Sequence, residues 1–428
     1  MDYLLLDKSR PALLALIGIN AISAALYVQA EPLEVQLSAT QEYSDNVTKT
    51  QNKEDDWLSK VGLKLGQTLT KGAFESSLSA DFGFEHYWGD TFGDEVTTEV
   101  IYDGRYNFSP SLSWLIKDEL TEDVLNSSTP NTPDTRVRKN VFTTGPSYRI
   151  AVSAKDDLVL GGQYKQIDFD SNTAIDSKRN TATADYVHRF ANELTFTWSN
   201  SGEWADLDNE TDIETLESEV RLSKRYNDLF ASMGVGVTRL TTEQSSGDRK
   251  SDEVTGSLNL SYQASAAVGL TYAYNRKLTD SASETVFQIF EHPITIGSSE
   301  TVLMQEHVAG VNYKPNSRDV FQLKGSSTTE ENETTTLEDK EYSAAVSWSH
   351  KVNAVWNWLM SSEYTNKTFG GSNAEQDTYE HSIQVNHHWY KNFSSRYYVE
   401  YESKDSDGGA AEYDAMTVGV GVDYVPNF

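Results

Sequence analysis

The chain ends on the stretch Ala415-Met-Thr-Val-Gly-Val-Gly-Val-Asp-Tyr-Val-Pro-Asn-Phe428, in which apolar and polar residues alternate. One face carries Met416, Val418, Val420, Val422 and Tyr424, and the other carries Thr417, Gly419, Gly421 and Asp423. This alternation predicts a β-strand with one apolar and one polar face. An apolar edge strand invites aggregation, so this strand needs a partner. A closed barrel supplies one by pairing the last strand with the first, near Leu33–Ser44, where the two glycines would allow close approach. An edge strand of a soluble sheet is the alternative.

The composition favours a barrel with a polar interior. The chain has 428 residues, a net charge of -30, no cysteine, 23 Tyr, 16 Phe and 9 Trp. Its mean hydropathy of -0.55 excludes a bundle of membrane helices. A membrane barrel needs apolar residues only at alternate positions, plus aromatic girdles, and disordered acidic chains lack such aromatics. Without cysteine there is no disulfide framework, and the acidity argues against a nucleic-acid partner.

The first thirty residues have the pattern of an export signal. Lys8 and Arg10 precede an apolar run over residues 11–27, and Val28-Gln-Ala30 ends in the small-x-small pattern of a cleavage site. We therefore predict a cleaved signal peptide over residues 1–30 and a single domain over residues 31–428. Asp2 and Asp7 are unusual in a signal peptide, so a retained anchor is the alternative.

From Leu33 onward the chain reads as alternating segments of about 10 to 13 residues, as expected of tilted membrane strands. An example is the apolar series Val268, Leu270, Tyr272 and Tyr274. Short turns such as Thr70–Gly72 alternate with longer polar connections. These include Thr121–Lys139, Asp206–Asp212, Thr241–Ser251, Thr279–Glu300 and Ser326–Glu338. We predict an all-β, antiparallel up-and-down transmembrane barrel with short periplasmic turns and long extracellular loops. Ten long loops imply twenty strands; eighteen is the alternative, because Val302–Tyr313 and Val320–Ser326 are ambiguous. A soluble sandwich or propeller does not explain the loop asymmetry.

If the apolar phase faces lipid, the other phase lines a lumen. Arg or Lys on the lipid face would cost about 2–4 kcal/mol at the midplane, so confinement of charges to one phase supports this assignment. The predicted lumen-lining residues are Glu75, Asp81, Glu85, Glu99, Asp103, Arg105, Lys117, Glu119, Arg149, Lys165, Asp185, Arg189, Glu203, Glu217, Glu219, Arg221, Arg225, Glu363, Glu380, Arg396, Tyr398, Glu400 and Glu402. Opposite charges on neighbouring strands, such as Asp103 and Lys117, are expected to pair. Twenty strands enclose more space than side chains fill, which implies a hydrated passage.

The longest loop, Thr279–Glu300, contains apolar residues between polar flanks. They are Val286, Phe287, Ile289, Phe290, Ile294 and Ile296. Such residues either extend the hairpin above the membrane or fold inward and form a constriction. Contact with a surface or a phage is a third reading.

No pattern of residues indicates catalysis. A Gly-rich phosphate loop, an H-E-x-x-H pair and a nucleophile elbow are all missing from the sequence. His387 and His388 would point to opposite faces of a strand, so they cannot share a metal. The acidic segments near Asp206 and Asp405 faintly resemble calcium loops, but we interpret them as solvated loops. We predict no enzyme activity, no metal and no cofactor.

Two stretches, Leu37-Ser-Ala-Thr-Gln-Glu-Tyr-Ser-Asp-Asn-Val47 and Arg138-Lys-Asn-Val-Phe-Thr-Thr-Gly-Pro-Ser-Tyr148, resemble a known family. It comprises the outer-membrane β-barrel porins found with exopolysaccharide biosynthesis clusters, including PEP-CTERM-associated proteins. The ending with Tyr424 and Phe428 likewise resembles the closing strand of bacterial outer-membrane barrels, which serves as an assembly signal. Pro426 departs from the usual ending. The resemblance implies a channel that exports a secreted polysaccharide, without catalytic residues.

We therefore expect a bacterial outer-membrane channel for a glycan chain. The charge of -30 disfavours an anionic polymer. Tyr87 and Tyr398 are candidate sugar-stacking faces. A diffusion porin for oligosaccharides and a plugged barrel acting as receptor or adhesin are the alternatives. Expected partners are the lipid bilayer with lipopolysaccharide, the barrel-assembly machinery, the glycan and periplasmic polysaccharide-export components; nucleic acid is not expected.

Overall fold

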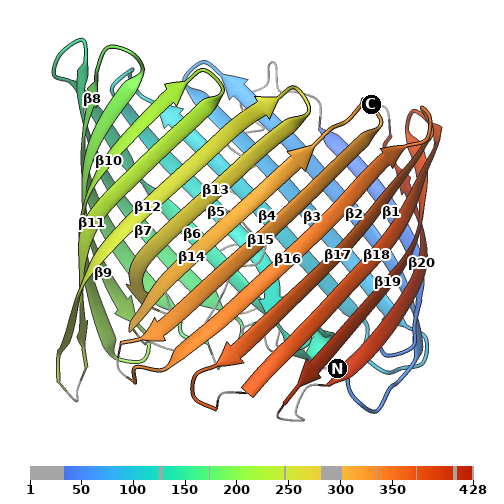
Figure 1. Ribbon diagram of the computed structural model, residues 1–428. Helices are drawn as coiled ribbons and strands as arrows, with labels where there is room; N and C mark the ends of the chain where they lie inside the picture. The colour runs from blue at the N-terminus through green and yellow to red at the C-terminus, as the bar shows by residue number, and fades with distance from the viewer. Residues whose placement is uncertain are drawn as a thin grey trace.

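The computed structural model describes residues 33–124, 129–172, 174–244, 247–280, 301–333, 335–372, 374–407 and 412–426. These residues form one 20-stranded antiparallel sheet that closes where β1 pairs with β20 (Figure 1). The strands are β1 Glu34–Ser44, β2 Asp56–Lys71, β3 Phe74–Tyr87, β4 Glu95–Asn107, β5 Leu112–Val124, β6 Arg136–Ala151, β7 Asp156–Phe169, β8 Ser177–Arg189, β9 Leu194–Leu207, β10 Thr211–Tyr226, β11 Leu229–Glu243, β12 Arg249–Ser265, β13 Val268–Asp280, β14 Thr301–Tyr313, β15 Asp319–Asn332, β16 Glu338–Lys351, β17 Trp356–Phe369, β18 Ala374–Tyr390, β19 Phe393–Ser406 and β20 Tyr413–Tyr424. The predicted barrel is confirmed, and the ambiguous segments are β14 and β15, which gives twenty strands rather than eighteen.

The two faces of the wall differ as the alternation predicts. Val61 and Met233 on the outer face are each 58% exposed, and Val418 of β20 is 44% exposed, as expected of side chains meant for lipid. At the end with the short turns, Phe321 stacks between Tyr313 and Trp348, with ring centroids 6.1 and 5.8 Å away. Such aromatic rings form the girdle of a membrane barrel.

Several connections are shorter than the sequence suggested. Only residues 208–210 separate β9 from β10, 244–248 separate β11 from β12, and 333–337 separate β15 from β16. The strands extend into polar sequence because the backbone ladder continues where no lipid imposes an apolar face. The segment Thr121–Lys139 is strand at both ends, in β5 up to Val124 and in β6 from Arg136, with the short helix η1 (Pro133–Thr135) between them. The long connections nevertheless share one barrel end, here called the outer mouth.

The seam between β1 and β20 runs in register from Leu37 opposite Tyr424 to Ser44 opposite Thr417. Gly419 has a different role from the one expected, because the Tyr398 ring from β19 lies over it. A Cβ atom at Gly419 would come within 2.3 Å of Tyr398 Cζ. The Tyr398 hydroxyl thereby reaches across β20 and donates to Glu42 of β1. The seam is thus fastened by a side chain that spans the last strand.

Several predictions concern residues outside the described ranges. They are the signal peptide over residues 1–30, the terminal Phe428 and the apolar residues Val286, Phe287, Ile289, Phe290, Ile294 and Ile296. Among the described residues, no helix has the length and apolar character needed to cross a membrane.

Candidate functional site

The interior of the barrel is the candidate site. Neighbouring strands place the predicted residues on shared inward positions, and the expected pair forms, with Lys117 Nζ 2.8 Å from Asp103. Glu75 lies opposite Arg105 in the β3–β4 ladder. Further ion pairs of this side are Lys64–Asp81, Arg149–Asp157, Arg189–Asp157, Arg179–Glu203 and Arg221–Glu219. We call the inner side of β1–β10 the ion-paired arc.

Other predicted lumen-lining residues lie opposite like charges, aromatic rings or uncharged side chains. Glu99 lies opposite Asp81, and Lys165 opposite Arg179, so like charges face each other there. The Arg225 guanidinium stands 5.7 Å from the Phe230 ring centroid. Three more members lie opposite residues without charge, Glu119 opposite Ile101, Asp185 opposite Val159 and Glu217 opposite Thr238. Arg396 donates to the Thr40 hydroxyl of β1 at 2.9 Å.

The inner side of β11–β18, here called the hydroxyl arc, has a different chemistry. The inward positions of β11 from Phe230 to Thr242 carry no charged side chain. Hydroxyl groups pair across neighbouring strands, as in Ser326–Ser343 at 2.7 Å and Ser361–Ser382 at 2.6 Å. Since hydroxyl and amide groups both donate and accept hydrogen bonds, this arc can exchange partners with water or a hydroxylated solute.

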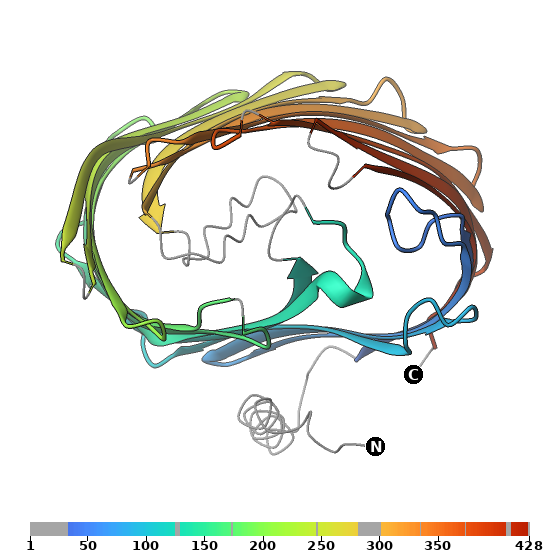
Figure 2. The ribbon, with the colours of Figure 1, turned by 90° about the horizontal axis from the view of Figure 1, so that it is seen from below.

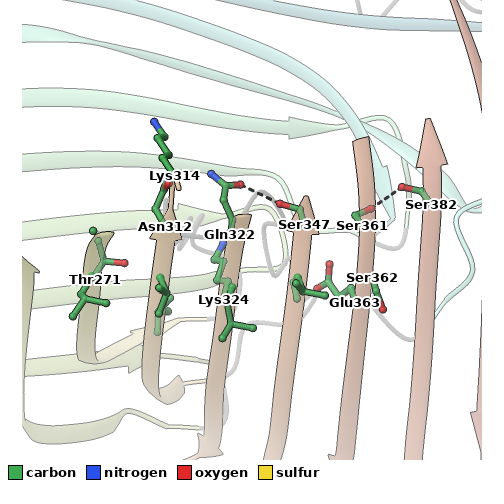
Figure 3. Close-up of a pocket in the computed structure, with 18 of the residues that line it drawn as sticks. Thr271, Asn312, Lys314, Gln322, Lys324, Ser347, Ser361, Ser362, Glu363 and Ser382 are labelled. Atoms are coloured by element: carbon green, nitrogen blue, oxygen red, sulfur yellow. Dashed lines mark hydrogen bonds between the residues drawn. The ribbon is translucent and has the colours of Figure 1, made fainter. Parts of the chain in front are cut away.

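A cavity of about 980 Å³ follows the hydroxyl arc (Figure 3). Ser347 donates to Gln322 at 3.3 Å within it, and Ser361 and Ser382 form the next pair along the wall. Lys314 and Lys324 line one part of the cavity and Glu363 another. The cavity therefore offers mainly neutral polar groups, with basic and acidic side chains in separate parts.

A row of carboxylates crosses the end of this arc. Glu363 lies opposite Glu380, which lies opposite Glu402 in the β17–β18–β19 ladders. Glu402 accepts from Lys49 Nζ at 2.6 Å and from the Tyr413 hydroxyl. Glu400 and Glu402 also line a second cavity, of about 480 Å³, near the outer mouth. Glu402 of this row therefore lines both cavities.

The outer end of β13 separates from β12 and turns into the lumen, while β13 stays paired with β14 and β14 with β15. The β12–β13 ladder stops at Gly256 opposite Arg276, while Lys277–Asp280 continue to pair with β14. Figure 2 shows the yellow end of β13 turned into the barrel opening. Leu278 and Leu303 pack there in a buried cluster with residues of the inner wall. The wall members are Ala205, Leu207, Ile213 and Leu240.

A buried ion pair fixes these strand ends against the inner wall at β8. Arg179 of β8 donates to both carboxylate oxygens of Asp280, at 3.0 and 2.8 Å, and to Glu203 at 2.9 Å. The Arg179 and Asp280 side chains are 1% and 3% exposed. Bidentate geometry and burial make this a strong, directional contact. On the wall side, Thr242 and Thr301 share a hydrogen bond of 3.4 Å.

A second hairpin, β5–β6, also enters the outer mouth. The β4–β5 ladder stops at Val100 opposite Leu120, and Thr121–Val124 pair only with β6 among the described strands. Figure 2 shows η1, which joins the two strands, inside the opening. Arg136 contacts Glu85 of β3 at 3.3 Å, and the 480 Å³ cavity lies between η1 and the wall. Tyr87 lines this cavity but is only 5% exposed.

The pair Arg179–Asp280 was missing from the sequence prediction. Arg179 shares its alternate phase with Asp185 and Arg189, so periodicity could have placed it in the lumen. Its partner lies 101 residues away on a strand that is not a neighbour. Nothing local in the sequence indicates that contact.

Together, the closed sheet, the apolar outer face with its aromatic girdle and the polar lumen define a barrel of the outer-membrane type. No family model matches the chain, and no curated protein matches it. Among solved structures it is similar to the FrpB iron transporter of Neisseria meningitidis. The apoprotein of the F5-1 variant has a TM-score of 0.53 and 8% identity, covering 92% of this chain and 81% of that one. The F3-3 variant has a TM-score of 0.50 and 8% identity, covering 95% and 83%.

A looser likeness is to the outer-membrane protein OpdK of Pseudomonas aeruginosa, with a TM-score of 0.42, 9% identity and coverage of 93% and 100%. At such identities the FrpB likeness shows the fold alone. The closed barrel with its apolar outer face and aromatic girdle supports an outer-membrane location. The exopolysaccharide-associated family remains a resemblance seen in the sequence.

Proposed function

We propose that this protein is an outer-membrane channel that passes a neutral, hydroxyl-rich solute, and that its cargo is a secreted glycan chain. The observation that carries the proposal is the hydroxyl arc, where Gln322, Ser347, Ser361 and Ser382 line a cavity of about 980 Å³. A glycan sheds water hydrogen bonds on entering a channel, and such a wall replaces them without a strong electrostatic trap.

The carboxylate row supports a preference in charge. Like charges directly opposite each other are unfavourable in a sheet, and Glu363, Glu380 and Glu402 are so arranged. Such a row repels anions and attracts cations within a Debye length of about 8 Å. A neutral or cationic glycan therefore suits this lumen better than an anionic polymer.

The proposal includes the expected partners. A glycan exporter in the outer membrane would contact lipid and lipopolysaccharide on its apolar face. It would require the barrel-assembly machinery for insertion, and periplasmic export components at the end with the short turns. The resemblance of the segments 37–47 and 138–148 to exopolysaccharide-associated porins supports this part.

A direct test compares secreted polysaccharide from a deletion strain carrying the parent gene or a variant. Ser361→Ala with Ser382→Ala removes one lumenal hydroxyl pair without enlarging either side chain. Ser362→Ala, on the neighbouring outward position where the hydroxyl contacts His381, is the matched control. We expect reduced secretion for the double variant and normal secretion for the control. Undiminished secretion from the deletion strain itself would overturn the export proposal.

A diffusion porin for oligosaccharides is the second candidate. It is favoured by the strand ends fixed in the outer mouth by Arg179 and Asp280, because a fixed constriction sets a size limit. Liposome swelling with oligosaccharides of increasing length distinguishes the two. A sharp cut-off after a few sugar units, together with normal polysaccharide secretion in the deletion strain, would favour the porin.

A further inference from the structure

Among the described strands, none pairs with one of the two backbone edges of the outer part of β12. Residues Arg249–Thr255 pair with β11 on one side. On the other side, the ladder with β13 ends at Gly256 opposite Arg276 in the described part of the chain. The Arg276 side chain occupies this edge instead, donating to the Val254 carbonyl and to Glu253 at 2.8 Å. Toward the outer mouth from Gly256 and Arg276, β12 and β13 are therefore no longer paired.

The open edge matches the displaced end of β13 in register. Antiparallel partners advance by one residue in opposite directions, so the existing ladder would continue with Thr255 opposite Lys277 and Glu253 opposite Thr279. Val254, which is 56% exposed on the outer face, would then lie beside Leu278. In this register Lys277 and Thr279 would face the lumen and Leu278 and Asp280 the outer side, as the alternation along β13 predicts.

The observed position has its own set of contacts. Asp280 is held by Arg179, Leu278 and Leu303 complete the apolar cluster, and Thr301 bonds Thr242. The alternative position would replace these contacts by backbone hydrogen bonds to β12. Arg179 would keep Glu203, at 2.9 Å, so its charge would retain a partner. Switching elements in proteins commonly have two such discrete packings.

From this geometry we propose that the outer ends of β13 and β14, Lys277–Asp280 and Thr301–Met304, form a gate with two positions. In the inward position, seen here, the Arg179–Asp280 pair is a latch that holds the strand ends against the inner wall at β8. In the outward position, β13 joins the open edge of β12 and the mouth widens. The gate goes beyond the proposed cargo, because it concerns when the channel conducts.

Cysteine cross-linking tests the outward position, and the chain has no native cysteine. Glu253→Cys with Thr279→Cys would form a disulfide only when β13 extends along β12. Ser257→Cys with Asn275→Cys, a pair already in register, controls for oxidation and folding. We expect slow cross-linking at 253–279, made about tenfold faster or more by Asp280→Asn, since breaking a buried ion pair releases the latch.

Arg239→Gln disrupts a solvent-exposed pair with Asp252 and should leave this cross-linking rate unchanged. Failure of the 253–279 pair to cross-link in either background, while 257–275 cross-links fully, would overturn the gate. An equal acceleration by Arg239→Gln would also overturn the latch, because it would show a general loosening of the barrel.

Conductance supplies the second measurement. Thr242→Cys with Thr301→Cys would lock the inward position, since the two hydroxyls lie 3.4 Å apart. We expect lower single-channel conductance in KCl after oxidation and recovery after reduction in the same membrane. Identical conductance in both states would overturn the proposal. Because KCl is the probe, this result is independent of whether a glycan is the cargo.

Discussion

The two hairpins that enter the outer mouth are held there by different means. The ends of β13 and β14 have a buried apolar cluster and an ion pair whose members are 1% and 3% exposed. The β5–β6 hairpin relies on Arg136 and Glu85, of which the arginine side chain is 26% exposed. Both hairpins fold back over the inner face of strands that precede them in the chain.

This difference shows that burial determines how strongly an arginine–carboxylate pair holds a hairpin in place. Water competes for the Arg136–Glu85 contact, and Lys60, 3.7 Å from Glu85, shares the carboxylate. Around Asp280 the surroundings exclude water, so loss of Arg179 would leave a carboxylate in an apolar site. We therefore expect β13–β14 to be the firmly held hairpin and β5–β6 the more easily released one.

The largest effect should come from Arg179→Leu. Removing the guanidinium strips Asp280 of a bidentate partner, which for a buried pair costs about 3–5 kcal/mol. A Thr242→Cys background reports the release, because Thr242 is buried beneath the strand ends. Maleimide labelling of this cysteine should become fast in Arg179→Leu and remain slow in its parent. Slow labelling in both would show that the apolar cluster alone holds the hairpin.

Leu278→Ala should have the next largest effect. Leu278 is fully buried in the lumenal cluster, and truncating a buried leucine costs about 2–3 kcal/mol where the surroundings partly relax. Labelling at Thr242→Cys should accelerate, although less than in Arg179→Leu. Leu216→Ala on the outer face is the matched control, since Leu216 is 41% exposed. Equal acceleration by both would contradict a specific role for the cluster.

Arg136→Leu should release the β5–β6 hairpin at a smaller cost of about 1 kcal/mol, as for a partly exposed ion pair. The reporter is hydrogen exchange of the η1 region, where the Thr135 amide donates to the Thr132 carbonyl at 3.0 Å. Exchange should quicken there and stay unchanged around Leu278. An effect larger than that of Arg179→Leu on its own hairpin would reverse the ranking.

Arg239→Gln should have the smallest effect on hairpin release and on stability. Arg239 and Asp252 form a 2.6 Å ion pair on the outer surface, with side chains 58% and 61% exposed. Such exposed pairs contribute little to stability, because water and salt screen them. Neither labelling at Thr242→Cys nor the thermal midpoint should change measurably. A clear loss of stability would mean that exposed ion pairs near the outer mouth stabilise the barrel more than their burial suggests.

The sequence was sufficient to predict the barrel because a membrane imposes a period of two on every strand. This period placed Val61, Val418 and the charged pair Asp103–Lys117 on their proper faces. The same rule assigned β14 and β15 only weakly, since inward Val302 and Val308 blur the alternation. Their identity as strands depends on neighbours that no local pattern contains.

Leu278 shows most clearly where sequence reasoning ended. It continues the outward phase of Leu270, Tyr272 and Tyr274, which would place it against lipid. The phase holds, but β13 bends inward after Arg276, so the same face meets the inner wall instead. Periodicity gives the face of a strand and cannot tell which medium that face meets once the strand leaves the sheet.

The buried ion pair also has a consequence for the order of folding. Arg179 and Asp280 are 101 residues apart, and strands β9 to β12 lie between them. Forming a contact between residues so far apart in the chain requires closing a long loop, which costs conformational entropy. Such contacts therefore form after the ladders between neighbouring strands. The pair can close only when all of these strands have joined one curved sheet. Protection of Thr242→Cys during refolding would therefore mark the moment at which this half of the barrel is complete.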